Sequence, residues 1–206
     1  SLAYYVASNE STEVTGTPEL LNKLDGTRGF QMQSECEGVH DGSPYKQVNP
    51  MQHYENTASA RGSRVDGFNP EYGAPTLPTV EILREMMDEK DLWPINKEVW
   101  DYLDGNGFHL MSTMYADLVN NYGQSSSIDE FAQKGQFVGA MNSKSIWEVW
   151  NYNKLDYGDR FCSGLLFWYH NCPVRQVCAR MWDWSLEPTA SLYHTANALE
   201  PLHAQF

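Results

Sequence analysis

The chain has few positive charges and no long apolar stretch. Its 206 residues include 14 Lys and Arg against 27 Asp and Glu, which gives a formal net charge of −13 at pH 7. Such a surface repels phosphate backbones, so we expect no nucleic-acid partner. No apolar run approaches the roughly 18 residues needed to cross a bilayer, so we expect no membrane partner. The acidic balance is compatible with a neutral or cationic substrate.

Metal-site patterns are also missing. The 4 cysteines form no CxxC pair, and the 6 histidines show no paired ligand spacing. We therefore expect no metal and no cofactor. The cysteines are expected to be buried or half-buried thiols, and the sequence leaves a single disulfide open, as it does the cellular localisation. The cysteines are Cys36, Cys162, Cys172 and Cys178.

Two glutamates follow short strand-like runs. Residues 2–7 lead into Asn9 and Glu10, and residues 65–68 lead into Glu71. A run of β-forming residues that stops at a polar step is typical of a strand whose carboxyl end presents a carboxylate. In a (β/α)8 barrel, chemistry gathers at the carboxyl ends of the strands. Paired carboxylates at one mouth are what glycoside hydrolysis needs.

Strand and helix patterns alternate along the chain, which predicts a parallel α/β architecture. Further strands are expected at 30–34 and 163–169. The second is a continuous apolar run, which is typical of a strand covered on both faces. The segment 35–67 is rich in Gly, Ser, Asn and Pro and is predicted to be a loop with little regular structure.

Three helices are predicted from spacing and capping residues. Residues 19–24 form a short helix with Thr17 as N-cap and Pro18 in the first helical position. Residues 78–87 form a second helix, with apolar side chains at helical spacing. The longest begins after Ser127, where a capping box is completed by Glu130, and runs to about residue 152.

The residues around the second glutamate resemble a known family. Phe68-Asn69-Pro70-Glu71-Tyr72-Gly73 is similar to the nucleophile segment of glycoside hydrolase family 2. The similarity is to the branch that holds β-mannosidases, endo-β-mannosidases and exo-β-D-glucosaminidases. Further matches follow in the family's order over almost the whole chain, among them 92–95, 163–166 and 200–205.

The resemblance implies a particular fold, the C-terminal portion (about strands 4–8) of a (β/α)8 TIM barrel. Glu10 would end the fourth strand, Glu71 the seventh, and residues 165–169 would form the eighth. Residues 1–200 would be a partial catalytic barrel domain, and 201–206 the start of a linker to a following domain. The N-terminal half of the barrel and the β-sandwich domains would be the missing partners of this piece.

The resemblance also implies a retaining mechanism. Asn9 and Glu10 match the family's Asn-Glu acid/base motif, and Glu71 matches its nucleophile. A retaining site holds the two carboxyl groups about 5 Å apart, so that one can attack the anomeric carbon directly. Glu10 would protonate the leaving group and later deprotonate water, while Asn9 would contact the 2-position of the sugar.

Supporting residues follow from the same resemblance. Trp168, near the end of the last strand, suits the floor of the sugar subsite. Tyr45, in a stretch similar to the family's Gly-Pro-Tyr loop, or Tyr54 would hydrogen-bond the nucleophile or the sugar. Residues 171–174 depart from the family's Asn-x-Pro-Trp pattern, which leaves the aglycone side open. Other acidic candidates are Glu35 as a further carboxylate, and Asp41 and Glu55 for an amino sugar's ammonium group.

The function expected from these residues is hydrolysis of terminal β-mannosides or β-glucosaminides. One alternative is another family 2 activity, such as β-galactosidase or β-glucuronidase. A second is a non-catalytic carbohydrate-binding or degenerate barrel protein, and a third is an unrelated α/β domain that uses these carboxylates in salt bridges. The isolated piece is expected to be inactive or poorly folded, because half a barrel exposes an edge strand and apolar faces.

Overall fold

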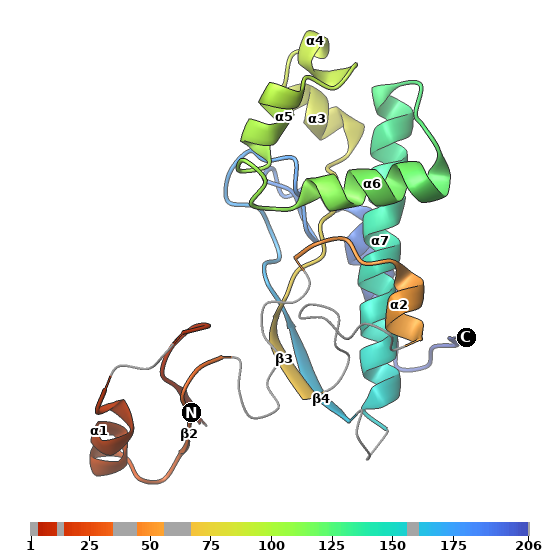
Figure 1. Ribbon diagram of the computed structural model, residues 1–206. Coiled ribbons are helices and arrows are strands. Elements are labelled where there is room, and N and C mark those ends of the chain that lie inside the picture. Colours follow the sequence, from red (N-terminus) through yellow and green to blue (C-terminus); the bar gives the residue numbers. More distant parts are fainter. Residues whose placement is uncertain (1–3, 12–14, 35–44, 56–66, 156–160, 206) are drawn as a thin grey trace.

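A computed structural model gives the fold, and it describes residues 4–11, 15–34, 45–55, 67–155 and 161–205. The described residues form two parts, a small N-terminal unit and a larger body (Figure 1). The elements in chain order are β1 (Tyr4–Val6), α1 (Thr17–Leu24), β2 (Gly29–Gln31), α2 (Pro50–Tyr54), β3 (Gly67–Tyr72), α3 (Val80–Met86), α4 (Glu89–Leu92), α5 (Lys97–Leu103), α6 (Met111–Tyr122), α7 (Ile128–Asn153), β4 (Cys162–Phe167) and α8 (Ala190–Ala198).

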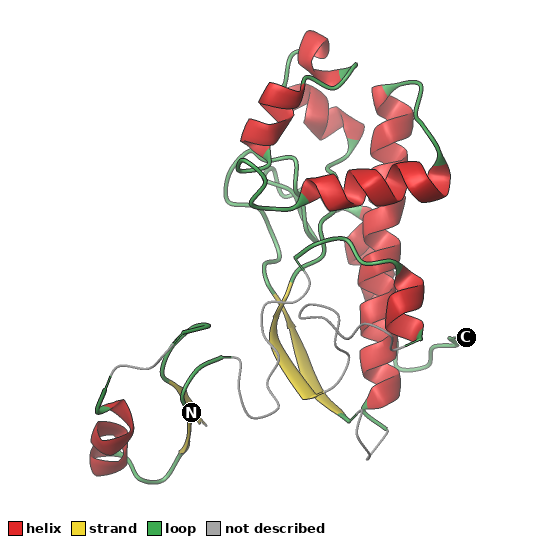
Figure 2. Ribbon diagram, viewed as in Figure 1, coloured by secondary structure: helices red, strands yellow, loops and turns green. Residues whose placement is uncertain are grey.

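Both sheets are two-stranded and parallel (Figure 2). In one, β1 pairs with β2, and in the other, β3 pairs with β4. The predicted parallel α/β class is therefore correct. A single run of strands 4–8 would hold five neighbouring strands, whereas the described residues hold four strands in two separate sheets. The described part of the chain between β2 and β3 contributes helix α2 instead of a strand.

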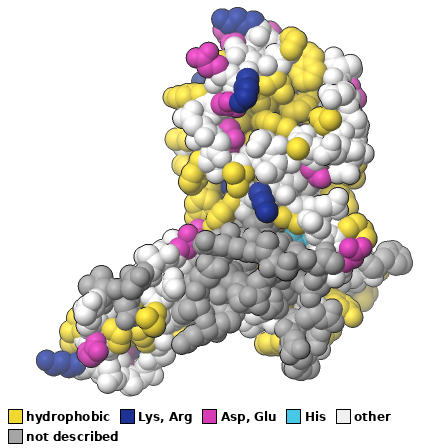
Figure 3. Space-filling view, in the orientation of Figure 1, with side chains coloured by type: hydrophobic (Ala, Val, Ile, Leu, Met, Phe, Trp, Pro, Cys, Tyr) yellow, Lys and Arg dark blue, Asp and Glu magenta, His cyan; other side chains and the backbone are white. Residues whose placement is uncertain are grey.

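The N-terminal unit consists of β1, α1 and β2. Tyr5 ties the strand to the end of the helix, since its hydroxyl donates to Asp25 at 3.0 Å. Helix α1 has no buried residue, and Figure 3 shows hydrophobic side chains on the surface of this unit. Its N-cap is Gly16, in the left-handed conformation at φ 88°, so the prediction of Thr17 as cap was wrong by one residue. A glycine takes that φ without steric cost, and Thr17 then begins the helix.

The larger body is built along α7, which contacts α2, α6 and α8. Helix α6 lies across α7 (Figure 1). The Ser127 side chain accepts from the Glu130 amide at 3.3 Å, which confirms the predicted N-cap. The Glu130 carboxylate instead accepts from the amide of Ser126, so the reciprocal half of the capping box shifts by one residue. One apolar cluster joins α3, α5, α6 and the first half of α7, and a second packs β3 and β4 on its other half.

Two sequence expectations differ from the structure. The apolar run at 163–169 is not covered on both faces, because Leu166 is 54% exposed and Trp168 36%. The segment 35–67 contains helix α2, which Asn49 caps by accepting from the Met51 amide at 3.0 Å. Asn followed by Pro50 at the first turn is an N-terminal helix signal that the overall loop composition concealed.

Three cysteines lie in the described residues, and all three are buried: Cys162, Cys172 and Cys178. Cys36 lies outside the described residues. Within the described ranges, no helix combines the length and the apolar character needed to cross a membrane.

Candidate active site

The carboxyl ends of β3 and β4 lie together because the two strands are parallel. Their register changes just before this end: Asn69 is opposite Leu165, and Tyr72 is opposite Phe167. Between these two pairs β3 has two residues, Pro70 and Glu71, where β4 has one, Leu166, so β3 contains a β-bulge. Proline has no amide hydrogen for the ladder, so a bulge is a position in a strand where Pro70 is tolerated. Glu71 is the residue that follows it, and bulges of this kind re-aim a side chain.

Asn69 fixes the local geometry of the bulge. It is 1% exposed, and its Oδ1 accepts from the backbone amide of Glu71 at 2.9 Å. The backbone amide of Glu71, which the bulge takes out of the strand pairing, thus has a hydrogen-bond acceptor in the Asn69 side chain. A backbone donor away from water needs such a partner. Asn69 therefore orients the segment that carries Glu71, and this segment is a bulged strand. Glu71 itself is half-buried.

An aromatic pair borders this strand end. The backbone amide of Trp168 donates to the carbonyl of Tyr72 at 2.6 Å, so Trp168 continues the pairing beyond β4. The Trp168 ring meets the Tyr45 ring edge-on, with centroids 5.1 Å apart. The backbones of residues 73 and 168 can approach each other because residue 73 is a glycine: a Cβ there would collide with the carbonyl oxygen of Trp168. A flat, partly exposed indole at this strand end is a surface on which the apolar face of a pyranose can pack.

The other predicted carboxylate lies on the first sheet. Glu10 follows β1 in the left-handed conformation at φ 47°, and its backbone amide donates to the Ser34 hydroxyl at 2.9 Å. Asn9 contacts the same hydroxyl, at 3.5 Å from its Oδ1. Ser34 follows β2, so both residues are held at the carboxyl end of the parallel β1–β2 pair. Both are exposed.

The structure therefore brings together some of the predicted site residues. Glu71, Trp168 and Tyr45 gather at the end of the β3–β4 sheet, and Asn9 and Glu10 at the end of the β1–β2 sheet. The two groups belong to the two different parts of the molecule (Figure 1). That Glu10 faces Glu71 across one sugar remains a prediction. Glu35 and Asp41 lie outside the described residues, and Glu55 is exposed at the end of α2.

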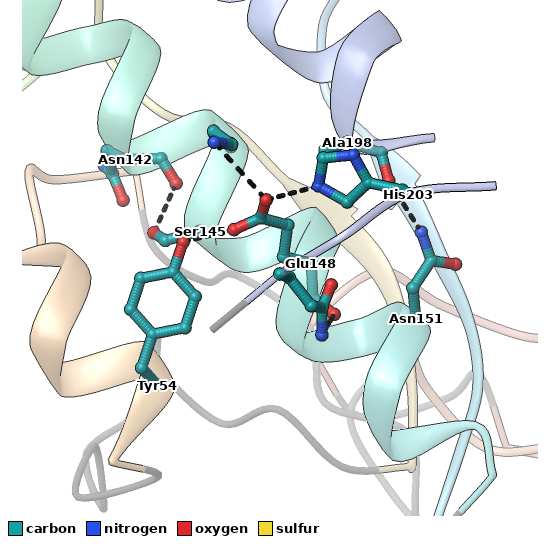
Figure 4. A network of polar contacts seen from close by, with 9 residues as sticks. Tyr54, Asn142, Ser145, Glu148, Asn151, Ala198 and His203 are labelled. Carbon is teal, nitrogen blue, oxygen red and sulfur yellow. Dashed lines mark hydrogen bonds and ion pairs between the residues drawn. The ribbon is translucent and has the colours of Figure 1, made fainter. Parts of the chain in front are cut away.

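Tyr54 is occupied elsewhere. Its hydroxyl donates to the Glu148 carboxylate on α7 (Figure 4). Burial, together with the hydrogen bond and the negative charge of Glu148, raises the pKa of Tyr54. The phenol therefore stays protonated and acts as a donor to α7, whereas its predicted contact with the nucleophile or the sugar stays untested.

Glu148 is the centre of a polar cluster that sequence analysis missed. Its side chain is 3% exposed and also accepts from His203 Nε2 at 2.6 Å, with the Lys144 ammonium at 3.5 Å (Figure 4). Burial alone raises the pKa of Glu148, but these partners outweigh burial and the net direction is downward. The cluster attaches α2 and the C-terminal segment to α7. Lys144 and Glu148 have the i,i+4 spacing of a helical ion pair, but Tyr54 and His203 are distant in sequence, so no spacing pattern could reveal the whole cluster.

Metal binding has no support in the described ranges, where no group of three or more His, Cys, Asp or Glu side chains could hold an ion. The described groups at the β3–β4 end include the Glu71 carboxylate, the amide of Asn69 and the aromatic pair. Such a set can present a nucleophile or a general base to a ligand that stacks on Trp168.

Comparison with known proteins supports the resemblance to the glucosaminidase and mannosidase branch. The chain is 26% identical over 178 residues to an exo-β-D-glucosaminidase of Amycolatopsis orientalis, covering 82% of this chain and 17% of that protein. It is 25% identical over 205 residues to a mannosylglycoprotein endo-β-mannosidase of Lilium longiflorum, covering 88% and 20%. The chain thus spans about a fifth of the length of these relatives. No protein-family model matches the chain.

A solved structure shows the same fold. The crystal structure of the exo-chitosanase CsxA of Amycolatopsis orientalis superposes with a TM-score of 0.79 and 20% identity, over 99% of this chain and 26% of that one. The arrangement of both parts of the chain is therefore that of a segment within a larger protein fold. Sequence and structure agree that the chain is similar to glycoside hydrolases.

Proposed function

We propose that the chain carries the two catalytic carboxylates of a retaining exo-β-glycosidase, with Glu71 as nucleophile and Glu10 as acid/base. The observation that carries the proposal is the position of Glu71. It sits on a bulge at the carboxyl end of a parallel strand pair, its amide is held by Asn69, and the next residue, Tyr72, accepts from the backbone amide of Trp168. The names of the relatives favour β-glucosaminides or β-mannosides as substrates.

The proposed fold is the C-terminal part of a (β/α)8 barrel. In such a barrel the sheets β1–β2 and β3–β4 are pieces of one closed sheet, and their carboxyl ends open onto one mouth. Glu10 and Glu71 would then flank a single sugar. This arrangement would allow double displacement. In the first step, Glu71 attacks the anomeric carbon while Glu10 protonates the leaving oxygen. In the second step, Glu10 deprotonates the water that hydrolyses the glycosyl-enzyme.

Variants of the full-length polypeptide that carries this chain test the assignment. We expect Glu71→Ala to lower kcat by about 10⁴-fold or more, because the nucleophile is lost. Glu10→Ala should retain turnover of aryl glycosides with good leaving groups and regain rate with azide, which needs no general base. Exposed glutamates supply matched controls, Glu19→Ala in the same part as Glu10 and Glu81→Ala in the same part as Glu71.

The substrate panel is aryl β-mannoside, β-glucosaminide, β-galactoside and β-glucuronide, with the anomeric configuration of the product followed by NMR. Retained configuration on one of the first two sugars is the expected result. Turnover of only the third or fourth would reassign the sugar within the family. Ordinary activity in Glu71→Ala, or inverted product, would remove the proposed mechanism. No turnover by the wild type, with sugar still bound, would favour the non-catalytic carbohydrate-binding protein.

A further inference from the structure

Arg180 is a fully buried cation behind the strand end that carries Glu71. It is 1% exposed, and its Nη1 donates to the carbonyl oxygen of Gly73 at 2.7 Å. Its Cζ lies 5.3 Å from the ring centre of Tyr169, the residue after Trp168. One guanidinium therefore touches the chain just beyond Glu71 on one side and just beyond Trp168 on the other.

Among the described residues, Arg180 has no ion-pair partner. Its Nε is also buried with no hydrogen-bond partner among them. A guanidinium stays charged at any ordinary pH, and burying it unpaired is costly. Asp104, whose pKa burial raises to about 6, feels its charge without contacting it. Stability alone does not account for an arginine at this position.

The backbone around Arg180 is rigidly connected to the same strand end. The preceding residue, Ala179, exchanges two backbone hydrogen bonds with Thr76, at 3.1 and 2.7 Å. The carbonyl of Arg180 accepts from the Thr189 hydroxyl at 2.6 Å. On the far side, the Tyr169 hydroxyl accepts from Gln176 at 2.6 Å. The guanidinium is thus a fixed donor that can hold the carbonyl of Gly73 without moving itself.

We propose that Arg180 is a positioning residue, which locks the ends of β3 and β4 against each other through the Gly73 carbonyl and so fixes Glu71 relative to Trp168. The inference rests on the proposed function for its catalytic consequence. Its structural part concerns only the strand ends. A carboxylate that must attack an anomeric carbon tolerates little displacement, and an error of about 1 Å can cost roughly 100-fold in rate.

Steady-state kinetics of the full-length polypeptide test the catalytic part. We expect Arg180→Met to lower kcat about 100-fold while KM changes less than about threefold, since the misplaced group is the nucleophile and not the sugar platform. Arg180→Lys should recover about tenfold, because an ammonium can still donate to the Gly73 carbonyl. Arg175→Met is the control: Arg175 is exposed on the same loop, over the Trp184 ring, and its loss should leave kcat within twofold.

Hydrogen exchange tests the structural part without any substrate. The Trp168 amide, which donates to Tyr72, should exchange about tenfold faster in Arg180→Met than in the wild type, while exchange of amides in the middle of α7 should not change. In the control variant Arg175→Met, the exchange rate of the Trp168 amide should equal that of the wild type. If Arg180→Met does not fold, Arg180→Lys is measured instead and should show a smaller acceleration. Unchanged Trp168 exchange, or kcat within threefold of wild type, would overturn the proposal. A wild type without glycosidase activity would refute the proposed function, and Trp168 exchange would still decide the role of Arg180.

Discussion

At the scale of single residues, the two glutamates were recognisable because each follows a run of β-forming residues. That pattern correctly placed Glu10 beyond β1 and Glu71 at the end of β3. The bulge and the Asn69 contact to the Glu71 amide depend on which residues of β4 lie opposite, and register is a property of two strands, not of one. Arg180 gave no signal at all, because its partners Gly73 and Tyr169 are far from it in sequence.

His53 makes stability depend on pH. It is fully buried on α2, and its Nε2 contacts Asn142 Oδ1 on α7 at 3.2 Å, so this nitrogen carries the proton and donates. Burial lowers the pKa of His53 from 6.5 to about 4. The unfolded chain therefore takes up a proton below pH 6.5 that the folded chain refuses until about pH 4. Stability contributed by the neutral ring is complete above pH 6.5 and is lost as the pH falls toward 4.

We expect the free energy of unfolding to fall by about 2 kcal/mol from this residue between pH 7 and pH 5. Urea unfolding at the two pH values measures it. His53→Gln should be less stable at pH 7 but should lose much of this pH dependence. The exposed His170→Gln is the control and should retain the full dependence. An equal pH dependence in wild type and His53→Gln would contradict this account.

At the scale of elements, strong local signals were sufficient for α7, whose Ser127 cap and helical spacing predicted its start and its end near residue 152. Helices α5, α6 and α8 were not predicted, although Asn96 caps α5 by accepting from the Glu98 amide. Helix α6, by contrast, begins after Leu110 in a left-handed conformation, with no side-chain cap. Tertiary packing stabilises such helices more than their own propensity does.

Helix α7 passes close to the segment after β3, and a glycine allows this. A Cβ added to Gly139 would lie 2.5 Å from Thr76 Oγ1 and 2.9 Å from the Pro75 carbonyl oxygen. We expect Gly139→Ala to destabilise the protein by about 1–3 kcal/mol through overpacking, although alanine favours a helix. Thermal unfolding measures the change, with Gln133→Ala on the exposed face of α7 as control. A more stable Gly139→Ala protein would show that the backbones can separate at no cost.

At the scale of the whole molecule, the N-terminal unit has too little core to be stable alone. Helix α1 buries nothing, and Leu20, Leu24 and Val6 are each more than half exposed. A unit of this kind needs a covering surface, and its relatives are about five times longer than this chain, since the chain covers 17% and 20% of them. That the chain is one part of a larger catalytic barrel stays a prediction, and the sequence does not indicate how its two parts are covered.

Hydrogen exchange of the isolated chain and of the full-length polypeptide compares the two situations. In the isolated chain we expect amides of β1 and β2 to exchange within minutes, and amides in the middle of α7 at least about 100-fold more slowly. In the full-length polypeptide, protection of β1 and β2 should approach that of α7. Similar protection of the N-terminal unit in both samples would mean that this unit needs no further cover. The α7 amides serve as the internal reference.

The bulge at Pro70 has a consequence for how this region can change during evolution. Replacing Pro70 by another residue keeps the number of positions between Asn69 and Tyr72, so the extra residue on β3 remains. Deleting one position would restore simple alternation with β4 and send the carboxylate to the opposite side of the sheet. Point substitutions at residue 70 should therefore be tolerated where single-residue deletions are not, and a homologous sequence with a deletion there should lack the role that we propose for Glu71.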